Sequence, residues 1–266
     1  MMLMTPFIVK KAALEAAGIT EALINTHHLP DPVRAYMVQQ NAQRALQLSE
    51  AYEPELLGSA GTVHANRDWA DGADRIVVIY AANLSDIDLG ALVAFHDSHD
   101  DPMTMALFRA EHPEKCGIAT LDAQGVITEF IEKPEHPASD LANAGIYVLD
   151  ADAWREIADM DAFDFGFDVI PRFAGRMRGF AHPGYHRDIG TPEALERRQH
   201  VLRAMTLLDL DGACEAVAER LVSADLHEEG ANARLGRGLG LDGQGEEAAV
   251  AAGVEHAAAR GPQDGK

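Results

Sequence analysis

One short run of residues restricts what this chain can fold into more than any other. Ile76–Tyr80 reads Ile-Val-Val-Ile-Tyr, an unbroken apolar segment rich in β-branched residues. Such a segment is typical of a strand that is buried on both faces of a parallel sheet. Asp86 and Asp88 follow, and an apolar helical pattern then begins at Leu89, for which Asp88 is a suitable N-cap. The order of strand, polar turn and helix predicts an open α/β sheet with this strand at its centre.

The residues directly after this strand carry little chemistry. In an open α/β sheet, ligands bind outside the carboxyl ends of the strands. Ala81, Ala82 and Asn83 occupy that place here, and two of the three have no functional group. The sequence therefore predicts a ligand site at this edge to which the central strand itself contributes few polar atoms.

The remaining apolar patterns extend the α/β prediction along the chain. They predict a mixed, mostly parallel, Rossmann-like sheet flanked by helices. We expect helices over residues 6–17, 30–48 and 89–95, and strands over residues 21–26, 103–108, 116–121 and 126–131 and from residue 146. In α/β order a strand is expected before the first of these helices. None is present, so we expect a sheet that is incomplete at its N-terminal end.

The acidic composition limits the classes of partner. The chain has 43 Asp and Glu against 22 Lys and Arg, a net charge of −21, which argues against binding the phosphate backbone of a nucleic acid. No apolar run approaches the ~20 residues needed to cross a membrane. Two cysteines in 266 residues do not make a disulfide framework, which favours a reducing, cytoplasmic compartment.

The composition changes after Met205. Ten of the 23 glycines lie beyond this residue, and large apolar residues become rare. Leu210, Cys214, Val217 and Leu221 recur at helical spacing. We therefore expect a domain over residues 1–205 and an acidic, Ala- and Gly-rich tail over residues 206–266, with one helix and otherwise disordered.

Two histidines raise the question of a metal site. His96 and His99 are spaced i, i+3, and Asp97, Asp100 and Asp101 lie beside them. No third ligand stands at metal-binding spacing. We expect a solvated polar loop here.

Three other segments carry residues suited to ligand chemistry. Gly58 and Gly61 permit close backbone approach, so N–H groups there could bind a base edge or a phosphate; a plain turn is the alternative. Glu132 and Lys133 end a strand, where they suit a polyol phosphate or form a surface ion pair. Asn143 stands among small residues and can both donate and accept hydrogen bonds.

These segments occur in a characteristic order. Tyr-Glu-Pro-Glu-Leu-Leu-Gly-Ser-Ala-Gly, Asn-Leu-Ser-Asp-Ile-Asp-Leu, Cys-Gly-Ile, Glu-Lys-Pro, Ala-Asn-Ala-Gly-Ile-Tyr and Arg-Asp-Ile-Gly-Thr-Pro follow one another along residues 6–203. The ordered set resembles the sugar-1-phosphate nucleotidyltransferases, especially mannose- or heptose-1-phosphate guanylyltransferase-like members. It is far more specific than any one of its pieces.

The resemblance implies a nucleotide-diphospho-sugar transferase-like fold and a defined reaction. A nucleoside triphosphate and a sugar 1-phosphate would give a nucleotide sugar and pyrophosphate, with Mg²⁺ as cofactor. The resemblance also assigns residues to these ligands: Gly58, Ser59 and Gly61 to the base, Gly117, Glu132 and Asn143 to the sugar, Lys133 to the sugar phosphate and Asp188 to Mg²⁺. Lys133 and Asp188 would be the catalytic residues. The resemblance also allows a homo-oligomer.

Two features depart from the family pattern. The glycine-rich loop with Arg and Lys that follows the family's first strand has no counterpart in residues 1–205. Where relatives read Tyr-Ala-Asp-Asn, with the second magnesium ligand, this chain has Ala82, which offers no side-chain oxygen. Losing one electrostatic stabiliser typically costs on the order of 10²–10³ in rate.

Three interpretations stay open from the sequence. The chain is a nucleotidyltransferase that relies on Asp86 or on a partner chain for the absent ligand; or it is a non-catalytic module that binds a sugar phosphate or a nucleotide; or it is a truncated or decayed copy. Impaired catalysis is the expectation that the two departures favour.

Overall fold

The computed structural model describes residues 5–42, 46–191 and 256–260, together with the single positions 194, 196 and 201. The helices are α1 (Thr5–Ala16), α2 (Pro30–Asn41), α3 (Gly58–Ala65), α4 (Leu89–His96), α5 (Ala151–Ala158) and α6 (Ile170–Phe173), with short helical turns η2 (Arg67–Ala70), η3 (Pro113–Lys115) and the π-helical η4 (Phe165–Val169). The strands are β1 (Glu21–Thr26), β2 (Gln47–Tyr52), β3 (Arg75–Tyr80), β4 (Asn83–Ser85), β5 (Met103–Arg109), β6 (Gly117–Leu121), β7 (Ile127–Glu132), β8 (Leu141–Asp150), β9 (Met177–Ala181), β10 (His186–Asp188) and β11 (His256–Arg260).

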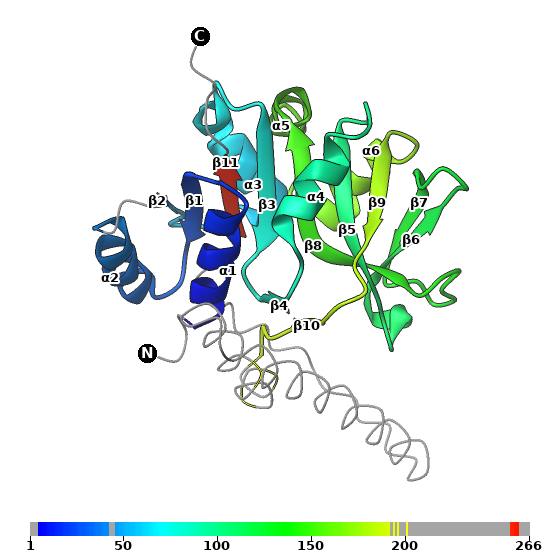
Figure 1. Cartoon of the computed structure of the whole chain (residues 1–266), viewed down its shortest axis with the longest axis horizontal. Coiled ribbons are helices and arrows are strands. Elements are labelled where there is room, and N and C mark those ends of the chain that lie inside the picture. Colours follow the sequence, from blue (N-terminus) through cyan, green and yellow to red (C-terminus); the bar gives the residue numbers. More distant parts are fainter. Residues whose placement is uncertain are drawn as a thin grey trace.

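A single large sheet organises these elements, in the order β2-β1-β11-β3-β8-β5-β9, with the β6–β7 hairpin attached to β8 (Figure 1). The pairings show that β2, β1, β3, β5 and β9 run in one direction, while β8 and β11 run against them. The predicted mixed α/β architecture is confirmed, and β3 lies in the middle of the order. Because β8 and β11 separate strands of the common direction, most neighbouring pairs are nevertheless antiparallel.

The central strand separates two apolar cores. Ile76 and Val78 face the core that includes α3, α5 and α6. Val77 and Ile79 face the core that includes α1, α2 and α4. All four side chains are at most 3% exposed, and burying each such side chain contributes about 1.5–3 kcal/mol. The unbroken apolar run of β3 is therefore explained by helices on both faces of the sheet.

Residues 256–260 form the strand between β1 and β3, which Figure 1 shows in red. Ala257 pairs with both Ile24 and Ile79, and Arg260 with both Glu21 and Ile76, antiparallel in each case. This segment differs from the disordered tail expected over residues 206–266. The remainder of that tail, including its expected helix, lies outside the described residues, so the boundary at residue 205 stays a prediction.

The segment after α2 also differs from its prediction. A helix was expected to continue to residue 48, yet α2 ends at Asn41 and β2 begins at Gln47. Asn41 closes the connection, since its side chain donates to the carbonyl of Leu48 (2.9 Å) and accepts from the Leu48 N–H (2.8 Å). β2 is then held by parallel pairing with β1. Among the described helices, none has the length and apolar character needed to cross a membrane.

Candidate functional site

β3 ends at the lower side of the large sheet in Figure 1, and the small β4–β10 sheet lies at this same side. β6 and β7 bring Gly117 and Glu132 opposite each other in register, and the next residue of β6 pairs with Ala142 of β8. The Glu132 carboxylate lies against the Cα of Gly117, and it is 3.0 Å from the place where a Cβ on Gly166 would stand. Two glycines therefore make room for one carboxylate.

Burial and two neighbouring charges shift the pKa of Glu132, and they do not all act in the same direction. Burial raises the pKa of Glu132 above its ordinary value, and the negative charge of Asp164 adds to this effect. Lys133 acts in the opposite direction. A half-buried carboxyl between a carboxylate and an ammonium is suited to accept hydrogen bonds from hydroxyl groups.

Lys133 has an unusual backbone. Its φ of +47° lies in the left-handed region, which a non-glycine residue adopts only at a cost. Its N–H donates to the carbonyl of Cys116 (3.0 Å), which ties the turn to the start of β6. Strain of this kind accumulates at functional sites, where the surrounding structure holds it.

Asp188 lies beside Ala82. β10 pairs with β4 so that Asp188 is opposite Asn83, and Ile189 N–H donates to the carbonyl of Ala82 (2.8 Å). Asp188 Oδ1 and Ala82 Cβ are 3.0 and 3.4 Å from the place where a Cβ on Gly190 would stand. One carboxylate and one methyl group thus occupy the positions where the resemblance expects two carboxylates.

The pKa of the Cys116 thiol depends on several charged residues of the candidate site. Burial raises the pKa of Cys116, and the charges of Glu132, Glu114 and Asp188 raise it further. Lys133 lowers it. The charges that act on this thiol thus include the three residues that the resemblance assigns to the sugar, its phosphate and Mg²⁺.

Gly58 begins α3 in a conformation that only glycine accepts there. Its φ is +75°, and a Cβ would stand 2.9 Å from ring atoms of Phe163 and would collide with the Phe163 carbonyl. That carbonyl accepts the N–H of Ala60 (3.0 Å). Of the alternatives considered for this segment, a plain turn is wrong: Gly58–Ala65 is a helix, packed at its first turn against the loop before η4.

Ser59 and Asn143 direct their polar groups into the protein. Ser59 Oγ donates to Asp164 Oδ2 (3.2 Å) and accepts from Phe165 N–H (2.8 Å). Asn143 donates from Nδ2 to the hydroxyl of Tyr147 (2.6 Å) and accepts from the Gly145 N–H at Oδ1 (2.9 Å). Gly61 faces the side chain of Leu57. Binding of substrate by these residues stays a prediction.

Sequence reasoning assigned no role to Asp164. Its carboxylate accepts from Ser59 and from Phe167 N–H (3.0 Å), and its charge acts on Glu132. The short polar and glycine pattern Asp-Phe-Gly-Phe-Asp was a visible signal. Asp164 is the N-cap of the π-helical turn η4, which orients its carboxylate. This turn has no sequence signature, although such turns are frequent at functional sites.

Glu53 is a second carboxylate whose contacts the sequence did not reveal. It is 2% exposed, and it accepts from Leu57 N–H (3.2 Å), Thr62 Oγ1 (2.5 Å) and Asn25 Nδ2 (3.3 Å). The carboxylate therefore ties the end of β1 to the first turns of α3.

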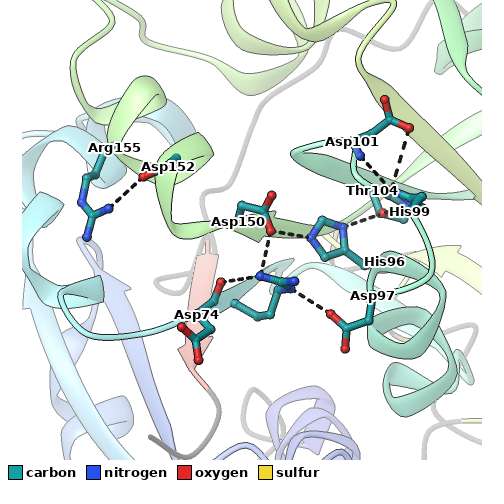
Figure 2. Close-up of polar contacts among 10 residues, drawn as sticks. Asp74, His96, Asp97, His99, Asp101, Thr104, Asp150, Asp152 and Arg155 are labelled. Atoms are coloured by element: carbon teal, nitrogen blue, oxygen red, sulfur yellow. Dashed lines mark hydrogen bonds and ion pairs between the residues drawn. The ribbon is translucent and has the colours of Figure 1, made fainter. Parts of the chain in front are cut away.

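A separate polar cluster lies near the opposite edge of the sheet, where β8 ends (Figure 2). His99 accepts from Asp101 N–H at Nδ1 (3.2 Å), so its Nε2 donates to Thr104 Oγ1 (3.0 Å). The Thr104 hydroxyl donates to His96 Nδ1 (2.8 Å), and His96 Nε2 donates to Asp150 (3.2 Å). The expected solvated loop describes Asp97, Ser98 and Asp100, which are exposed. It does not describe His96, which ends α4 and is 1% exposed.

The described residues contain no group of three or more His, Cys, Asp or Glu side chains arranged to hold a metal ion. This applies to the histidine cluster of Figure 2 and to the surroundings of Asp188. Asp86 is engaged with His182 Nε2 (2.7 Å), and Asp88 caps α4 by accepting from Ala91 N–H (2.9 Å).

The fold places the chain among α/β proteins with a mixed sheet, and comparison with known proteins identifies its family. The chain matches the family model of nucleotidyl transferases over residues 4–204. This match covers most of the chain, so the protein belongs to the nucleotidyl transferase family. The predicted membership of the sugar-1-phosphate nucleotidyltransferases is thereby confirmed.

Named relatives lie within that family. The "Probable mannose-1-phosphate guanylyltransferase 1" of Oryza sativa subsp. japonica is 29% identical over 185 residues, which cover 68% of this chain and 51% of the relative. A glucose-1-phosphate adenylyltransferase of Thermosipho melanesiensis is 34% identical over 146 residues, 50% of this chain and 35% of the relative. The chain thus spans about half the length, or less, of these curated relatives.

A solved structure supports the fold. HddC from Yersinia pseudotuberculosis matches with a TM-score of 0.59 and 21% identity, covering 72% of this chain and 83% of HddC. At this identity the likeness concerns the arrangement of strands and helices alone.

Proposed function

We propose that this chain binds a nucleoside triphosphate and a sugar 1-phosphate at the carboxyl edge of β3 and transfers the nucleotidyl group between them. The observation that carries this proposal is the strand pairing, which places Glu132 opposite Gly117, Lys133 beside Cys116 and Asp188 beside Ala82. A carboxylate for hydroxyl groups, an ammonium for a phosphate and a carboxylate beside the central strand are the groups that such substrates require. The names of the relatives add mannose and glucose 1-phosphates as substrates to be tested.

The reaction needs positioning more than covalent chemistry. A phosphate oxygen of the sugar 1-phosphate attacks the α-phosphorus of the nucleotide, a new P–O bond forms, and the bond to the β-phosphate oxygen breaks to release pyrophosphate. The attacking phosphate is already ionised, so no base has to remove a proton. Lys133 would hold the sugar phosphate, and Glu132 would accept from the sugar hydroxyls. Orientation and charge neutralisation then supply most of the rate.

The donor set around Asp188 fits a magnesium ion that arrives with the nucleotide. Mg²⁺ is commonly bound by one or two carboxylates, while water and substrate phosphates complete its octahedron. Asp188 would supply the one protein carboxylate, since Ala82 has no oxygen and Asp86 and Asp88 have other partners. When bound, the ion would neutralise charge on the phosphates. We further propose that turnover is slow, because Ala82 removes one stabiliser of that charge.

The test is release of pyrophosphate from each common nucleoside triphosphate in the presence of mannose 1-phosphate or glucose 1-phosphate. We expect measurable but slow release with at least one pair. Lys133→Met should reduce the rate about 10²-fold or more. Lys115→Met, which removes an exposed lysine from η3, is the matched control. Absence of both turnover and binding for every pair would overturn the proposal.

A non-catalytic binding module is the second candidate, and Ala82 is the observation that favours it. This candidate predicts saturable binding of a sugar 1-phosphate, weakened by Glu132→Gln, without pyrophosphate release. Hydrogen bonds to a charged group are worth about 1.5–3 kcal/mol, so the loss should be on the order of 10- to 100-fold in affinity. Turnover by the unmodified chain would exclude this candidate.

A further inference from the structure

The small β4–β10 sheet carries Asp188, and its pairing is short. Its ladder joins three residues of each strand, with Asp188 opposite Asn83. The two strands form a sheet of their own, separate from the large sheet. An isolated pair of strands is only marginally stable in water. The place of Asp188 beside Ala82 therefore depends on what holds this pair together at its two ends.

Asp86 holds the end of the pair that lies away from Asp188. Its backbone N–H donates to the carbonyl of Tyr185 (3.2 Å), which extends the ladder by one residue beyond β4. Its carboxylate accepts at Oδ1 from Nε2 of His182 (2.7 Å). The backbone and the side chain of one residue thus bind two positions of the segment that leads from β9 into β10. We refer to Asp86 and His182 as the β10 clamp.

The β10 clamp also joins the small sheet to the large one. The backbone N–H of His182 donates to the carbonyl of Leu107 in β5 (2.7 Å). The His182 side chain is 9% exposed and that of Asp86 is 42% exposed. Gly184 leaves room for their contact, because a Cβ there would collide with Asp86 Oδ1 and with the His182 ring. The contact is therefore built into the backbone around it.

The register of β10 decides where the Asp188 carboxylate lies. A slip of one residue turns every side chain of a strand to the opposite face, and it would move this carboxylate away from Ala82. At one end of the ladder, the Ile189 N–H bond to the Ala82 carbonyl (2.8 Å) opposes such a slip. At the other end, the β10 clamp opposes it, together with the burial of Tyr185, which is 1% exposed.

We propose that Asp86 and His182 are positioning residues that hold Asp188 in place for the magnesium complex of a nucleotide, and that Asp86 is not itself a metal ligand. This inference rests on the proposed function and goes beyond it, since it assigns a role to two residues that act through Asp188. The sequence left open that Asp86 supplies the absent ligand. A hydrogen bond to a charged group is among the stronger ones, so its loss should weaken the placement of Asp188 about 10-fold.

The direction of one effect separates the two roles of Asp86. The affinity for Mg²⁺ is measured by calorimetry in the presence of the non-reactive α,β-methylene analogues of GTP and of ATP. If Asp86 were a ligand, His182→Ala would release its carboxylate and leave the affinity unchanged or raise it. If Asp86 positions Asp188, His182→Ala should lower the affinity about 10-fold. His182→Gln keeps a donor for Asp86, and Asp86→Asn keeps an acceptor for His182, so both should retain most of the affinity.

Amide hydrogen exchange tests the clamp without any ligand. In His182→Ala the Ile189 N–H should exchange about 10-fold faster, because β10 opens more often, while the amides of β1 should be unaffected. Gly184→Ala should have the same effect, since its methyl group separates the pair, and it replaces His182→Ala if that variant does not fold. Asp88→Asn is the control: it removes the same charge two residues away and keeps a cap for α4.

The outcomes separate this inference from the proposed function. If neither analogue binds the unmodified chain, the proposed function fails and the role of the clamp in binding fails with it. If an analogue binds and His182→Ala leaves the Mg²⁺ affinity unchanged or raises it, the proposed function stands and the positioning role is overturned. Unchanged exchange at Ile189 in His182→Ala would also overturn it. So would an equal loss of affinity in Asp88→Asn, since the lost negative charge would then be the cause.

Discussion

Ala82 and Asp188 show how one side chain changes what a site can hold. The backbone brings them together through β4 and β10, so the geometry for two opposing side chains is present. Only Asp188 brings an oxygen. The consequence is a site whose protein contribution to a cation is a single carboxylate, with the rest left to water and to the substrate.

Restoring the second carboxylate gives the first prediction. Ala82→Asp should increase the affinity for the magnesium complex of a nucleoside triphosphate about 10-fold or more, because a second oxygen ligand would face Asp188. The measurement is a calorimetric titration at fixed nucleotide and varied Mg²⁺. Ala81→Asp adds the same charge one residue earlier and should have a much smaller effect. A gain that persists in the Ala82→Asp, Asp188→Asn double variant would contradict the shared site.

His96 and His99 predict how the free energy of unfolding depends on pH. Burial lowers the pKa values of His96 and His99 from the ordinary value of 6.5. For His96, Asp150 raises the pKa and Arg75 lowers it further. For His99, Asp101 raises the pKa and Arg178 lowers it further. The unfolded chain therefore takes up protons near pH 6.5, whereas the folded protein does so only at lower pH. The free energy of unfolding is retained above about pH 6.5 and decreases as the pH falls below it.

Urea unfolding at pH 7.5 and pH 5.5 measures this effect. His96→Gln keeps an acceptor for Thr104 and a donor for Asp150 but does not titrate, so it should reduce the loss of stability at pH 5.5. His112→Gln removes an exposed histidine and is the control. An identical loss in the His96→Gln variant and the unmodified chain would show that the acid sensitivity arises elsewhere.

Single residues were predictable where their chemistry is local. Glu132, Lys133 and Asp188 stand at or next to strand ends in recognisable short motifs, as β7 and β10 confirm, while their roles in binding stay predictions. Asp164 and Glu53 act through partners far along the chain, Ser59 and Asn25 respectively. Nothing in the sequence near these carboxylates states where those partners will be, so their positions required the fold.

At the scale of elements, α3 depends on how its first residue is accommodated. Gly58→Ala should destabilise the protein by about 3 kcal/mol or more, because the new methyl group would collide with Phe163 in addition to straining a positive φ. Gly18→Ala is the matched control, since Gly18 has the same φ of +75° with nothing within 4 Å of its Cβ position. That variant should cost only the backbone strain.

Chemical unfolding gives the free energy of unfolding of each variant. The difference between the two values is the cost of the Phe163 contact alone. The prediction fails if the two substitutions cost the same. Ligand binding adds a second measurement, because a displaced α3 should weaken nucleotide binding in Gly58→Ala while leaving it unchanged in Gly18→Ala.

Elements with strong local patterns were predicted well. The bounds of β1 and β3, and the start of α4 with its Asp88 cap, follow from apolar runs and capping chemistry that act within a few residues. β2 was missed because Gln-Leu-Ser-Glu-Ala-Tyr has no strand pattern of its own. Leu48 is its only buried residue, and parallel pairing to β1 holds it in the sheet. Tertiary pairing, rather than propensity, makes that strand.

At the scale of the whole molecule, β11 connects the two parts of the large sheet. Among the described strands, β1 and β3 are bridged only through β11. The sequence His-Ala-Ala-Ala-Arg is a weak strand former, because alanine is depleted in strands. Its place in the sheet could not be predicted, since it depends on partners at the other end of the chain.

Removal of residues 256–266 should therefore lower the free energy of unfolding, by on the order of 5 kcal/mol if each lost ladder hydrogen bond contributes about 1 kcal/mol. Amide hydrogen exchange should accelerate in β1 and β3 and much less in β5. Removal of residues 261–266 alone leaves β11 in place and should have little effect. Unchanged protection of β1 and β3 in the longer truncation would rule out the bridging role.

The position of β11 also has a consequence for the time at which the protein can fold. Residues 256–260 are translated long after β1 and β3, whose unpaired edges must wait for them. Pairings between distant segments form slowly, and exposed strand edges in the meantime are sites of aggregation. The central part of the sheet is thus completed only after residues 256–260 have left the ribosome, and until then the emerging protein depends on whatever covers those two edges.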